Sequence, residues 1–430
     1  MTGASETSRS GSVDPAAIGP SLAEIENAHA VVSRVAKRTP VETSTYLSEL
    51  LGTPVLLKLE NLQRTGSYKI RGAYYMMSKL TPEERARGVV AASAGNHAQG
   101  VAFAARELGV KATIFMPLGV ALPKLEATQD YGARVVLGGA TVDGPLRAAA
   151  EFARDTGAML IPPFDHPDIV AGQAALGLDV LQDVPDVDTV IVPIGGGGLA
   201  AGVASAVKNR AALTGRTIRV IGVQAENAAS YPVSLRAGVP TEIAIGSTIS
   251  DGIAVSKPGA YNFGIIRELV DDIVTVSDDD TARAIVVLLE RSKQVVEPAG
   301  AVGVAAILTG AVQASVEAAG GELGRTVVIL SGGNIDPLLM QRVVAAGLAV
   351  SDRYLSLRIM LPDRPGQLAR TSALIAEANA NVVEVLHTRH GNGLQLSQVE
   401  LKVSIETRGP DHKAEVVRIL REAGYDPIVD

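Results

Sequence analysis

Cysteine is absent from all 430 residues of the chain, and so is tryptophan. Without cysteine there is no disulfide, no thiolate metal ligand and no thiol nucleophile; the chain fits a reducing compartment, and the cytoplasm is its expected location. Aromatic residues make up only 3% of the sequence, so small aliphatic residues are expected to fill the interior. No uninterrupted apolar run reaches the roughly 18 residues of a membrane-spanning helix, so no membrane span is expected.

An excess of basic residues is also missing. Lysine and arginine number 39 against 46 aspartates and glutamates, which gives a formal net charge of −7. Proteins that bind nucleic acids or anionic membranes through their charge usually carry a basic surface. The composition therefore argues against both kinds of partner and leaves a small-molecule function open.

The chain is long enough for about three domain-sized units with an ample core. Met1 to Pro20 is rich in serine, glycine and alanine and has no apolar run, which predicts a disordered tail rather than a signal peptide. From Ile25 to Gly347, apolar strands alternate with helical stretches. Repeated units of this kind predict an α/β fold, with parallel sheets that carry helices on both faces.

A different organisation begins after Val350. Strands are expected at 354–361, 382–390, 396–407 and 425–429, and helices at 367–378 and 411–423. The order βαββαβ is that of a ferredoxin-like domain.

The segment Ser67-Tyr68-Lys69-Ile70 places a lysine between an apolar strand and a helix. The stretch 55–60 has the pattern of a buried strand, 61–66 that of a turn, and helical spacing resumes at Ile70. Lys69 is therefore expected to point into a cleft, where burial disfavours the ammonium form. A neutral amine is a nucleophile toward aldehydes. The alternative is a solvated surface lysine, which is the commoner case near a helix start.

Four consecutive glycines, Gly195 to Gly198, follow the apolar strand 189–194 and precede a helix that begins near Leu199. Their amides can converge on one phosphate group, and the helix start adds free N–H groups and the positive end of its dipole. A flexible turn is the alternative. The spacings typical of dinucleotide and nucleoside-triphosphate loops are absent from the sequence.

Two further turns come directly after apolar strands. Ser331-Gly332-Gly333-Asn334 follows 327–330, and Ser93-Ala94-Gly95-Asn96-His97 lies between the strand 89–92 and a helix at 98–108. Ligands bind beyond the carboxyl ends of parallel strands, so these turns, Lys69 and the glycines can meet in one crevice. Each turn alone is also an ordinary connection between a strand and a helix.

These segments, together with Val296-Glu297-Pro298-Ala299-Gly300-Ala301, closely resemble the threonine dehydratases, also called threonine ammonia-lyases. Those enzymes use pyridoxal phosphate and have the tryptophan-synthase-β fold type, also called fold type II. The resemblance runs from about Ile25 to Gly347. It implies a catalytic domain over 21–349 with two lobes, the smaller near 68–162, and a third domain over 350–430.

The resemblance also implies residue roles. Lys69 would carry the cofactor and act as the base at Cα, Asn96 would bond to the ring hydroxyl, and Ser331 would face the pyridine nitrogen. Tyr68 stands where the family usually has phenylalanine, and its ring could still pack against the cofactor. The phosphate loop is expected to comprise Gly195, Gly196, Gly197, Gly198 and Leu199. Substrate-binding residues are expected at Ser93, Ala94, Gly95, Asn96 and His97.

The implied reaction converts L-threonine to 2-oxobutanoate and ammonia, with serine as a slower substrate. Serine racemases are the nearest alternative, and by resemblance they carry a second serine where this chain has Ala94. Alanine cannot carry a proton, so dehydration without efficient racemisation is expected. Two more alternatives are a non-catalytic amino-acid sensor and a threonine synthase relative that acts on a phosphorylated substrate.

The C-terminal segment 363–368, with Asn381, resembles an ACT domain, a module that binds small amino acids. The resemblance implies effector-binding residues at Gly366, Gln367, Leu368 and Asn381. Isoleucine is a hypothetical effector, which would give an allosteric enzyme of isoleucine biosynthesis. The alternative is a module that only mediates dimerisation. A homotetramer is the expectation from the family.

Other conspicuous residues have simpler interpretations. Glu226 resembles a position that helps some relatives bind a monovalent or divalent cation. Glu297 is expected either to support the crevice or to take part in catalysis. His387 and His390 fall on opposite faces of a predicted strand, which argues against a shared metal. The run 278–280 is expected to cap a helix.

Overall fold

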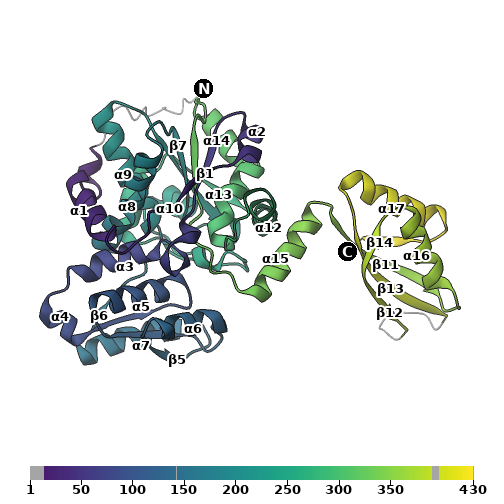
Figure 1. Cartoon of the computed structure of the whole chain (residues 1–430), viewed down its shortest axis with the longest axis horizontal. Coiled ribbons are helices and arrows are strands. Elements are labelled where there is room, and N and C mark those ends of the chain that lie inside the picture. Colours follow the sequence, from purple (N-terminus) through teal and green to yellow (C-terminus); the bar gives the residue numbers. More distant parts are fainter. Residues whose placement is uncertain (1–13, 142, 390–396, 430) are drawn as a thin grey trace, which may run out of the picture. The chain divides into compact units, whose positions relative to one another are not determined.

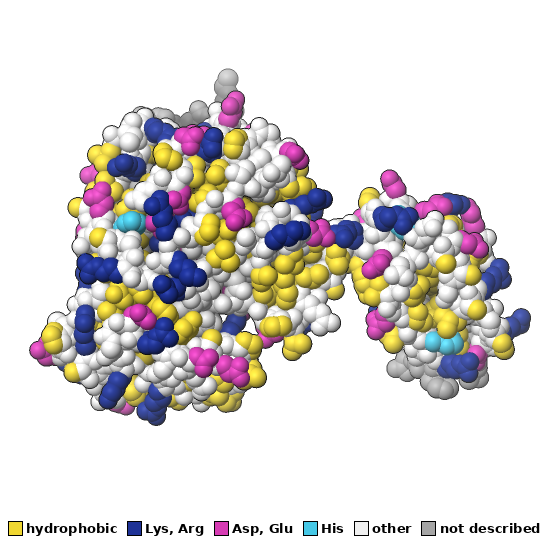
Figure 2. All heavy atoms as spheres, in the orientation of Figure 1, with side chains coloured by type: hydrophobic (Ala, Val, Ile, Leu, Met, Phe, Trp, Pro, Cys, Tyr) yellow, Lys and Arg dark blue, Asp and Glu magenta, His cyan; other side chains and the backbone are white. Residues whose placement is uncertain are grey.

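The computed structural model describes residues 14–141, 143–389 and 397–429. Its contacts divide the chain into two compact units. One contains the described residues up to Thr281 together with Leu288–Asp336, and the other contains Ala282–Val287 together with the described residues from Pro337 onward. Figure 2 shows acidic and basic side chains interspersed on the visible face of each unit.

The larger sheet of the first unit consists, among the described residues, of β1 (Val41–Thr43), β2 (Val55–Lys58), β7 (Thr189–Pro193), β8 (Arg219–Ala225), β9 (Asp272–Val276) and β10 (Thr326–Ile329). Its strand order is β1-β2-β10-β7-β8-β9. Of these strands, β1 and β7 are labelled in Figure 1. Neighbours from β2 to β9 are parallel, and β1 is antiparallel to β2. The predicted parallel sheet is confirmed, with one antiparallel edge strand too short to be recognised from its pattern.

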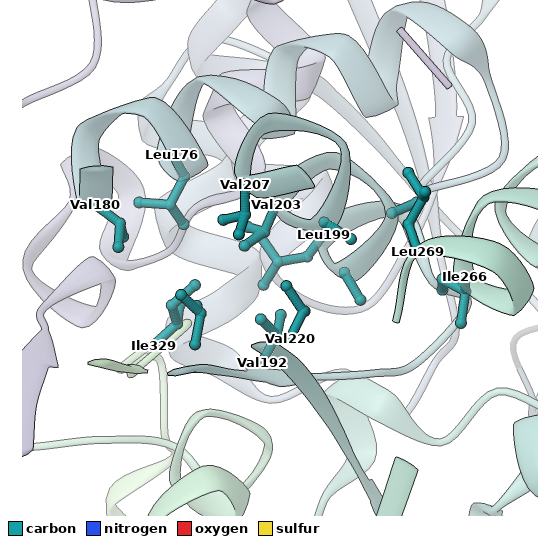
Figure 3. Close-up of a cluster of buried hydrophobic side chains, with 14 of the residues drawn as sticks. Leu176, Val180, Val192, Leu199, Val203, Val207, Val220, Ile266, Leu269 and Ile329 are labelled. Carbon is teal, nitrogen blue, oxygen red and sulfur yellow. The ribbon is translucent and has the colours of Figure 1, made fainter. Parts of the chain in front are cut away.

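Helices cover both faces of this sheet. They are α8 (Pro167–Asp183), α9 (Gly198–Thr214) and α11 (Ala260–Leu269) on one face and α13 (Pro298–Leu308) on the other. Val192 and Val220 of the sheet point toward Leu199 and Val203 of α9 (Figure 3). On the opposite face, the sheet packs so closely on α13 that a side chain at Gly303 would touch Val328. Burial of these aliphatic side chains is the main stabilisation of the layers.

A smaller sheet has the order β5-β4-β3-β6, and all its strands are parallel. Its strands are β3 (Val89–Ala92), β4 (Ala112–Met116), β5 (Arg134–Leu137) and β6 (Met159–Leu160). Alternate residues of β3 belong to different core clusters. Val89 and Ala91 pack with α3 (Lys69–Ser78) and α5 (Asn96–Leu108), whereas Val90 and Ala92 pack with α7 (Asp143–Thr156).

The remaining elements of the first unit connect or flank these layers. They are η1 (Pro15–Ala17), α1 (Leu22–Val32), α2 (Thr45–Leu51), η2 (Glu60–Leu62), η3 (Arg64–Gly66), α4 (Pro82–Arg87), α6 (Leu122–Asp130), η4 (Glu226–Ala228), α10 (Ser230–Ala237), η5 (Asp251–Ile253), the π-helical turn η6 (Leu288–Ser292) and α14 (Ala311–Ala318). The helix α12 (Asp278–Val287) begins in this unit, and its residues from Ala282 onward belong to the second unit. Among the described residues no single helix is long and apolar enough to cross a membrane. The bent pair α13 and α14 passes that test together, by length and composition.

The second unit has an antiparallel sheet in the order β12-β13-β11-β14. Its elements are α15 (Pro337–Val350), β11 (Tyr354–Pro362), α16 (Gln367–Glu377), β12 (Asn381–Thr388), β13 (Gln398–Glu406), α17 (Pro410–Glu422) and β14 (Pro427–Val429). Buried residues alternate along β11 and β13 and pack with α16 and α17. This is the ferredoxin-like order that the sequence predicts.

The compact units do not follow the predicted domain bounds at every point, and those bounds stay predictions. The predicted boundary at 349/350 assigns α15 to the catalytic domain, whereas α15 groups with the second unit, where Gly347 lets its backbone approach Ala282. The predicted tail, residues 1–20, includes a short 3-10 helix at Pro15–Ala17 with Pro15 buried. Residues 1–13 of that tail and His390 lie outside the described residues.

Candidate active site

Three parallel strands of the larger sheet end at the same edge. Val328 of β10 is the register partner of Leu57 in β2 and of Ile191 in β7, and each of these strands ends within two residues of that position. The segments that follow are the turn before Lys69, the Ser331 turn and the four glycines. Because parallel strands present their carboxyl ends together, these segments meet at one edge of the sheet.

Backbone contacts join the first two of these segments. The Tyr68 N–H group donates to the Ser331 carbonyl oxygen at 3.2 Å, and Ser67 pairs with Gly332 in an isolated β-bridge. Lys69 and Ser331 are thereby held close, as the sequence predicts. The Tyr68 ring lies partly buried beside the Lys69 amine, 5.3 Å from its ring centroid to Nζ. No described residue accepts a hydrogen bond from the Tyr68 hydroxyl group.

Lys69 is the first residue of α3, and its side chain is only partly exposed. Its Nζ donates to the carbonyl oxygen of Pro163 at 2.8 Å. Burial lowers the pKa of the amine to about 8, although the Glu297 carboxyl group acts in the opposite direction. A larger fraction of this amine is therefore neutral near pH 7 than of an ordinary lysine, which favours a nucleophilic or basic role.

The four glycines form a narrow cradle at the start of α9. Gly197 has a φ of 100°, and no side chain caps the helix, so the first amides of α9 are free to meet an anion. A side chain at Gly196 would lie 2.5 Å from the Phe164 ring, and one at Gly198 would lie 2.9 Å from the Phe164 carbonyl oxygen. At Gly195, the added atom would lie 3.0 Å from the backbone of Ile253.

Side-chain hydrogen bonds hold this cradle in place. The Tyr231 hydroxyl and the Asn262 amide both donate to the Gly196 carbonyl oxygen, at 3.2 and 2.9 Å. Asn262 also donates to the carbonyl oxygen of Phe164, the residue after Pro163. The segment that accepts the hydrogen bond from Lys69 is thus tied directly to the glycine turn, which places the amine and the anion cradle in one site.

The Ser93 to His97 turn leads from β3 into α5. Ser93, Ala94, Gly95 and Asn96 are partly exposed, and α5 begins without a side-chain cap. The start of α5 packs closely on that of α3, since an added atom at Gly100 would lie 3.1 Å from the Lys69 backbone. The uncapped amides can therefore bind a carboxylate near the amine.

His97 has a different environment from the one expected of a substrate ligand. It is buried, and its Nε2 donates to the carbonyl oxygen of Ile161 at 2.9 Å. Burial lowers its pKa to about 3, and the positive charge of Lys69 acts in the same direction. His97 is therefore neutral at physiological pH, and its side chain anchors α5 to the segment that leaves the smaller sheet.

The Asn96 amide lies in a row of hydrogen bonds. Its Oδ1 accepts from Asn334 Nδ2 at 2.7 Å, and its Nδ2 donates to Glu297 Oε1 at 2.6 Å. Asn334 in turn donates to the Thr65 carbonyl oxygen at 2.7 Å. The row joins α5, which packs against the smaller sheet, to the segments that carry Glu297 and Asn334, so the sequence-predicted cofactor residue Asn96 is held on both sides of its amide.

A buried ionic cluster fixes the start of α3, and sequence reasoning missed it. Arg71 Nε lies 2.8 Å from Glu60 Oε2, and Arg71 Nη1 lies 2.8 Å from Asp179 Oδ2. All three residues are buried. A buried pair of this kind is costly to break from one side, because the remaining charge stays in an apolar environment. Arg71 therefore fixes the helix turn that carries Lys69.

Comparison with known proteins agrees with this geometry. The family model described as pyridoxal-phosphate dependent enzyme matches residues 32–332. The chain belongs to this family. A second model, the ACT domain, matches residues 355–425. The predicted fold type and the predicted resemblance to threonine dehydratases are confirmed.

Individual family members are similar over most of the chain. An L-threonine ammonia-lyase of Geobacter sulfurreducens is 46% identical over 389 residues, which cover 90% of this chain and 94% of that protein. The processed threonine deaminase isoform 2 of Solanum lycopersicum has 36% identity and a TM-score of 0.69 over 76% of this chain and 95% of its own. Maize serine racemase has 32% identity and a TM-score of 0.70 over 76% and 98%.

The residues of the site fit pyridoxal phosphate, the cofactor of this family. The glycine turn leaves no room for side chains and presents the free amides of α9, which suits a phosphate group. The amine of Lys69 has a lowered pKa, which suits binding to an aldehyde. The G-x-G-x-x-G spacing of dinucleotide loops and the G-x-x-x-x-G-K-S/T spacing of nucleoside-triphosphate loops are both absent from the sequence.

The other predicted sites belong to other elements. In the second unit, Gly366 has a φ of 91° and precedes α16, and Leu368 is exposed. Gln367 accepts a hydrogen bond from Tyr425 at 3.3 Å, and the exposed Asn381 donates to Glu406. In the first unit, Glu226 is exposed at the end of β8, and the described residues contain no cluster of three or more metal-ligating side chains. A cation site there stays a prediction.

Proposed function

We propose that the chain catalyses the pyridoxal-phosphate dependent conversion of L-threonine to 2-oxobutanoate and ammonia, with serine as a slower substrate. The observation that carries the proposal is the convergence of the Lys69 amine and the glycine cradle at one sheet edge, in a family member similar to named threonine ammonia-lyases. The cofactor, when bound, supplies an acceptor for the electron pair that deprotonation leaves at the substrate Cα.

The residues of the chain orient the substrate and move its protons. Lys69 would hold the cofactor's aldehyde carbon and, once its amine is free, remove the Cα proton, which its lowered pKa favours. Gly195 to Leu199 would hold the phosphate, and Asn96 the ring hydroxyl. Ser331, a neutral hydroxyl, would face the ring nitrogen. The amides from Ser93 to Asn96 would bind the substrate carboxylate and so direct the Cα–H bond toward Lys69.

Serine dehydratase or racemase activity is the second candidate, favoured by the structural similarity to maize serine racemase. Ala94 argues against racemisation. It lies in the turn before α5 and has no hydroxyl group to protonate the face of Cα opposite Lys69. A non-catalytic amino-acid sensor would not need an amine with a lowered pKa beside an anion cradle, so this alternative explains less of the site.

Further features of the proposal concern the whole protein. We expect a homotetramer in the cytoplasm, a catalytic domain over 21–349 with its smaller lobe near 68–162, and regulation through an ACT domain over 350–430. Isoleucine as the effector would place the enzyme in isoleucine biosynthesis. A cation near Glu226 and effector contacts at Gly366, Gln367, Leu368 and Asn381 belong to the same set of proposals.

The decisive experiment measures 2-oxoacid release by the purified protein from threonine, serine and phosphohomoserine. We expect rapid release from threonine, slower release from serine and none from phosphohomoserine. Release from phosphohomoserine would assign the chain to a different reaction of the same fold type. Amino-acid binding without any release would favour the sensor.

A further inference from the structure

The carboxyl group of Glu297 has a defined place in the row that holds Asn96. Its Oε1 accepts the hydrogen bond from Asn96, and its own backbone N–H donates to the Gly332 carbonyl oxygen at 3.0 Å. Oε1 also packs against Gly332, where an added side-chain atom would lie only 2.2 Å away. Glu297 is 6% exposed, and among the described residues none donates a hydrogen bond to its second oxygen. The carboxyl group therefore lies inside the site beside the turn that contains Ser331.

The row leaves the Asn96 amide a single orientation. Its oxygen is engaged by Asn334 and one of its two N–H bonds by Glu297, so a flipped amide would place donor against donor and acceptor against acceptor. One N–H bond of Asn96 remains available. A hydrogen bond to an ionised carboxylate is stronger than one to a neutral acid, so the protonation state of Glu297 changes how firmly this amide is held and how strongly it is polarised.

Charged groups from several elements face Glu297. Lys69 of α3 and Lys124 of α6 favour its ionised form, and Asp251 of η5 disfavours it. Tyr68 also interacts with its charge. Burial is the largest influence and raises the pKa of Glu297 to about 7, with Asp251 adding to the increase. Lys124 and Asp251 lie 3.4 Å apart and join the two lobes.

We propose that Glu297 is a positioning residue: its carboxyl group orients the Asn96 amide, and the gain or loss of its proton acts through that amide on the bound cofactor. The proposal rests on the proposed function, since it requires pyridoxal phosphate beside Asn96. Glu297 acts through Asn96 and is not assigned a contact with the substrate. Through this row of hydrogen bonds, the electronic state of the cofactor depends on the proton of the Glu297 carboxyl group, in addition to the protons of the substrate and Lys69.

The test compares the pH dependence of the cofactor's visible absorption in the holoenzyme and in Glu297→Gln. Glutamine retains an oxygen that accepts from Asn96 but cannot titrate. We expect the wild-type absorption to change with a midpoint near 7, as Glu297 ionises, and the variant to lose that transition while it still binds the cofactor. An identical transition in both proteins would overturn the proposal.

Two variants outside the row test the same proton without altering Asn96. Asp251→Asn should lower the midpoint, and Lys124→Met should raise it, each by about 0.2–0.7 pH unit, as expected for partly solvated charges. If neither variant moves the midpoint, the proposal is wrong, even if Glu297→Gln does not fold. Infrared spectra of the apoprotein provide a readout without cofactor: a protonated carboxyl band should disappear near pH 7 in the wild type and be absent from Glu297→Gln.

The absorption measurement on the holoenzyme and the infrared measurement on the apoprotein separate this inference from the proposed function. A wild-type protein that binds no pyridoxal phosphate would overturn the proposed function, and with it the effect on the cofactor. A protein that binds the cofactor, shows the carboxyl band and yet has an absorption that ignores Glu297 would overturn the inference alone.

Discussion

At the scale of single residues, the site depends on where charge is placed in a poorly solvated cleft. Lys69 and Glu297 are both shifted toward their neutral forms by burial, and each partly opposes the shift of the other. His97 is kept neutral in the same way. The result is a site whose amine, carboxyl and imidazole groups carry less charge near neutral pH than the same groups in water.

This shift predicts a pH-dependent stability for the apoprotein. The pKa of Glu297 is raised from 4.5 to about 7, so between these values the folded state binds more protons than the unfolded state, and stability falls as pH rises. Glu297→Gln removes this loss. The unfolding free energy of the variant minus that of the wild type should therefore be about 1–3 kcal/mol larger at pH 7.5 than at pH 5. Urea unfolding at both pH values measures it.

Glu151→Gln is the matched control, because Glu151 is exposed within α7 and water solvates its side chain in the folded protein. It should show no such gain between the two pH values. If the difference in unfolding free energy between Glu297→Gln and the wild type is the same at pH 5 as at pH 7.5, the carboxyl group of Glu297 is ionised throughout this range.

The sequence identified Lys69, Asn96 and the glycine run because each belongs to a local motif, and the structure brings them to one site. It did not identify Arg71 or Asp179, since their ion pair joins positions far apart in the chain and no pattern marks either residue. His97 shows the other limit. Its place beside Asn96 suggested substrate binding, but the direction of its side chain depends on how α5 packs against Ile161.

At the scale of elements, patterns of hydrophobicity predicted most strands, because buried parallel strands are continuous apolar runs. β3 has the predicted bounds, and the bounds of β2, β7 and β10 differ from the predicted ones by one or two residues. Helix starts were less certain. α3 and α5 begin one and two residues before the predicted positions, at Lys69 and Asn96, because glycine and serine turns allow the helix to start inside the motif. The two functional residues are thus the first residues of their helices.

The start of α9 gives a prediction at this scale. Gly197 has a φ of 100°, and a side chain there would lie 2.0 Å from the Tyr231 hydroxyl oxygen. Gly197→Ala should distort the anion cradle and weaken pyridoxal-phosphate binding at least about tenfold, the size expected for a strained backbone position. Titration of the apoprotein with the cofactor, followed by visible absorption, measures the affinity.

Gly264→Ala provides the control for this change. Gly264 lies within α11, and a side chain at this position meets no atom within 4 Å, so the variant should bind the cofactor as the wild type does. If Gly197→Ala also retains full affinity and normal circular dichroism, the glycine turn does not hold the phosphate.

At the scale of the whole molecule, the chain joins a catalytic family domain to an ACT domain, and the question is whether the second controls the first. Each unit has its own core, with two sheets in the first unit and one in the second among the described residues. Coupling between two sites requires an effector that binds two states of the protein with different affinity. A tetramer, with four times the 44.4-kDa mass of the chain, would let ACT domains of different subunits share an effector site.

Gly366 provides the means to test this coupling. Its φ of 91° and the open space around it make it a position where a side chain strains the backbone and obstructs a ligand at the start of α16. Isoleucine should change the affinity of the full-length protein for threonine by about 5- to 150-fold, and Gly366→Ala should remove the response while activity without isoleucine stays the same. Initial rates over a range of isoleucine and threonine concentrations measure the effect.

Gly409→Ala is the matched control, because Gly409 also precedes a helix of the second unit, has a φ of 106° and faces open space. Linkage requires that threonine change the affinity for isoleucine by the same factor, which calorimetry on a Lys69→Ala protein can measure without turnover. Loss of the response in both glycine variants would indicate general damage to the unit. A wild-type protein that ignores isoleucine, valine and nucleotides would assign the ACT domain a structural role, since no effector would then distinguish two states of the enzyme.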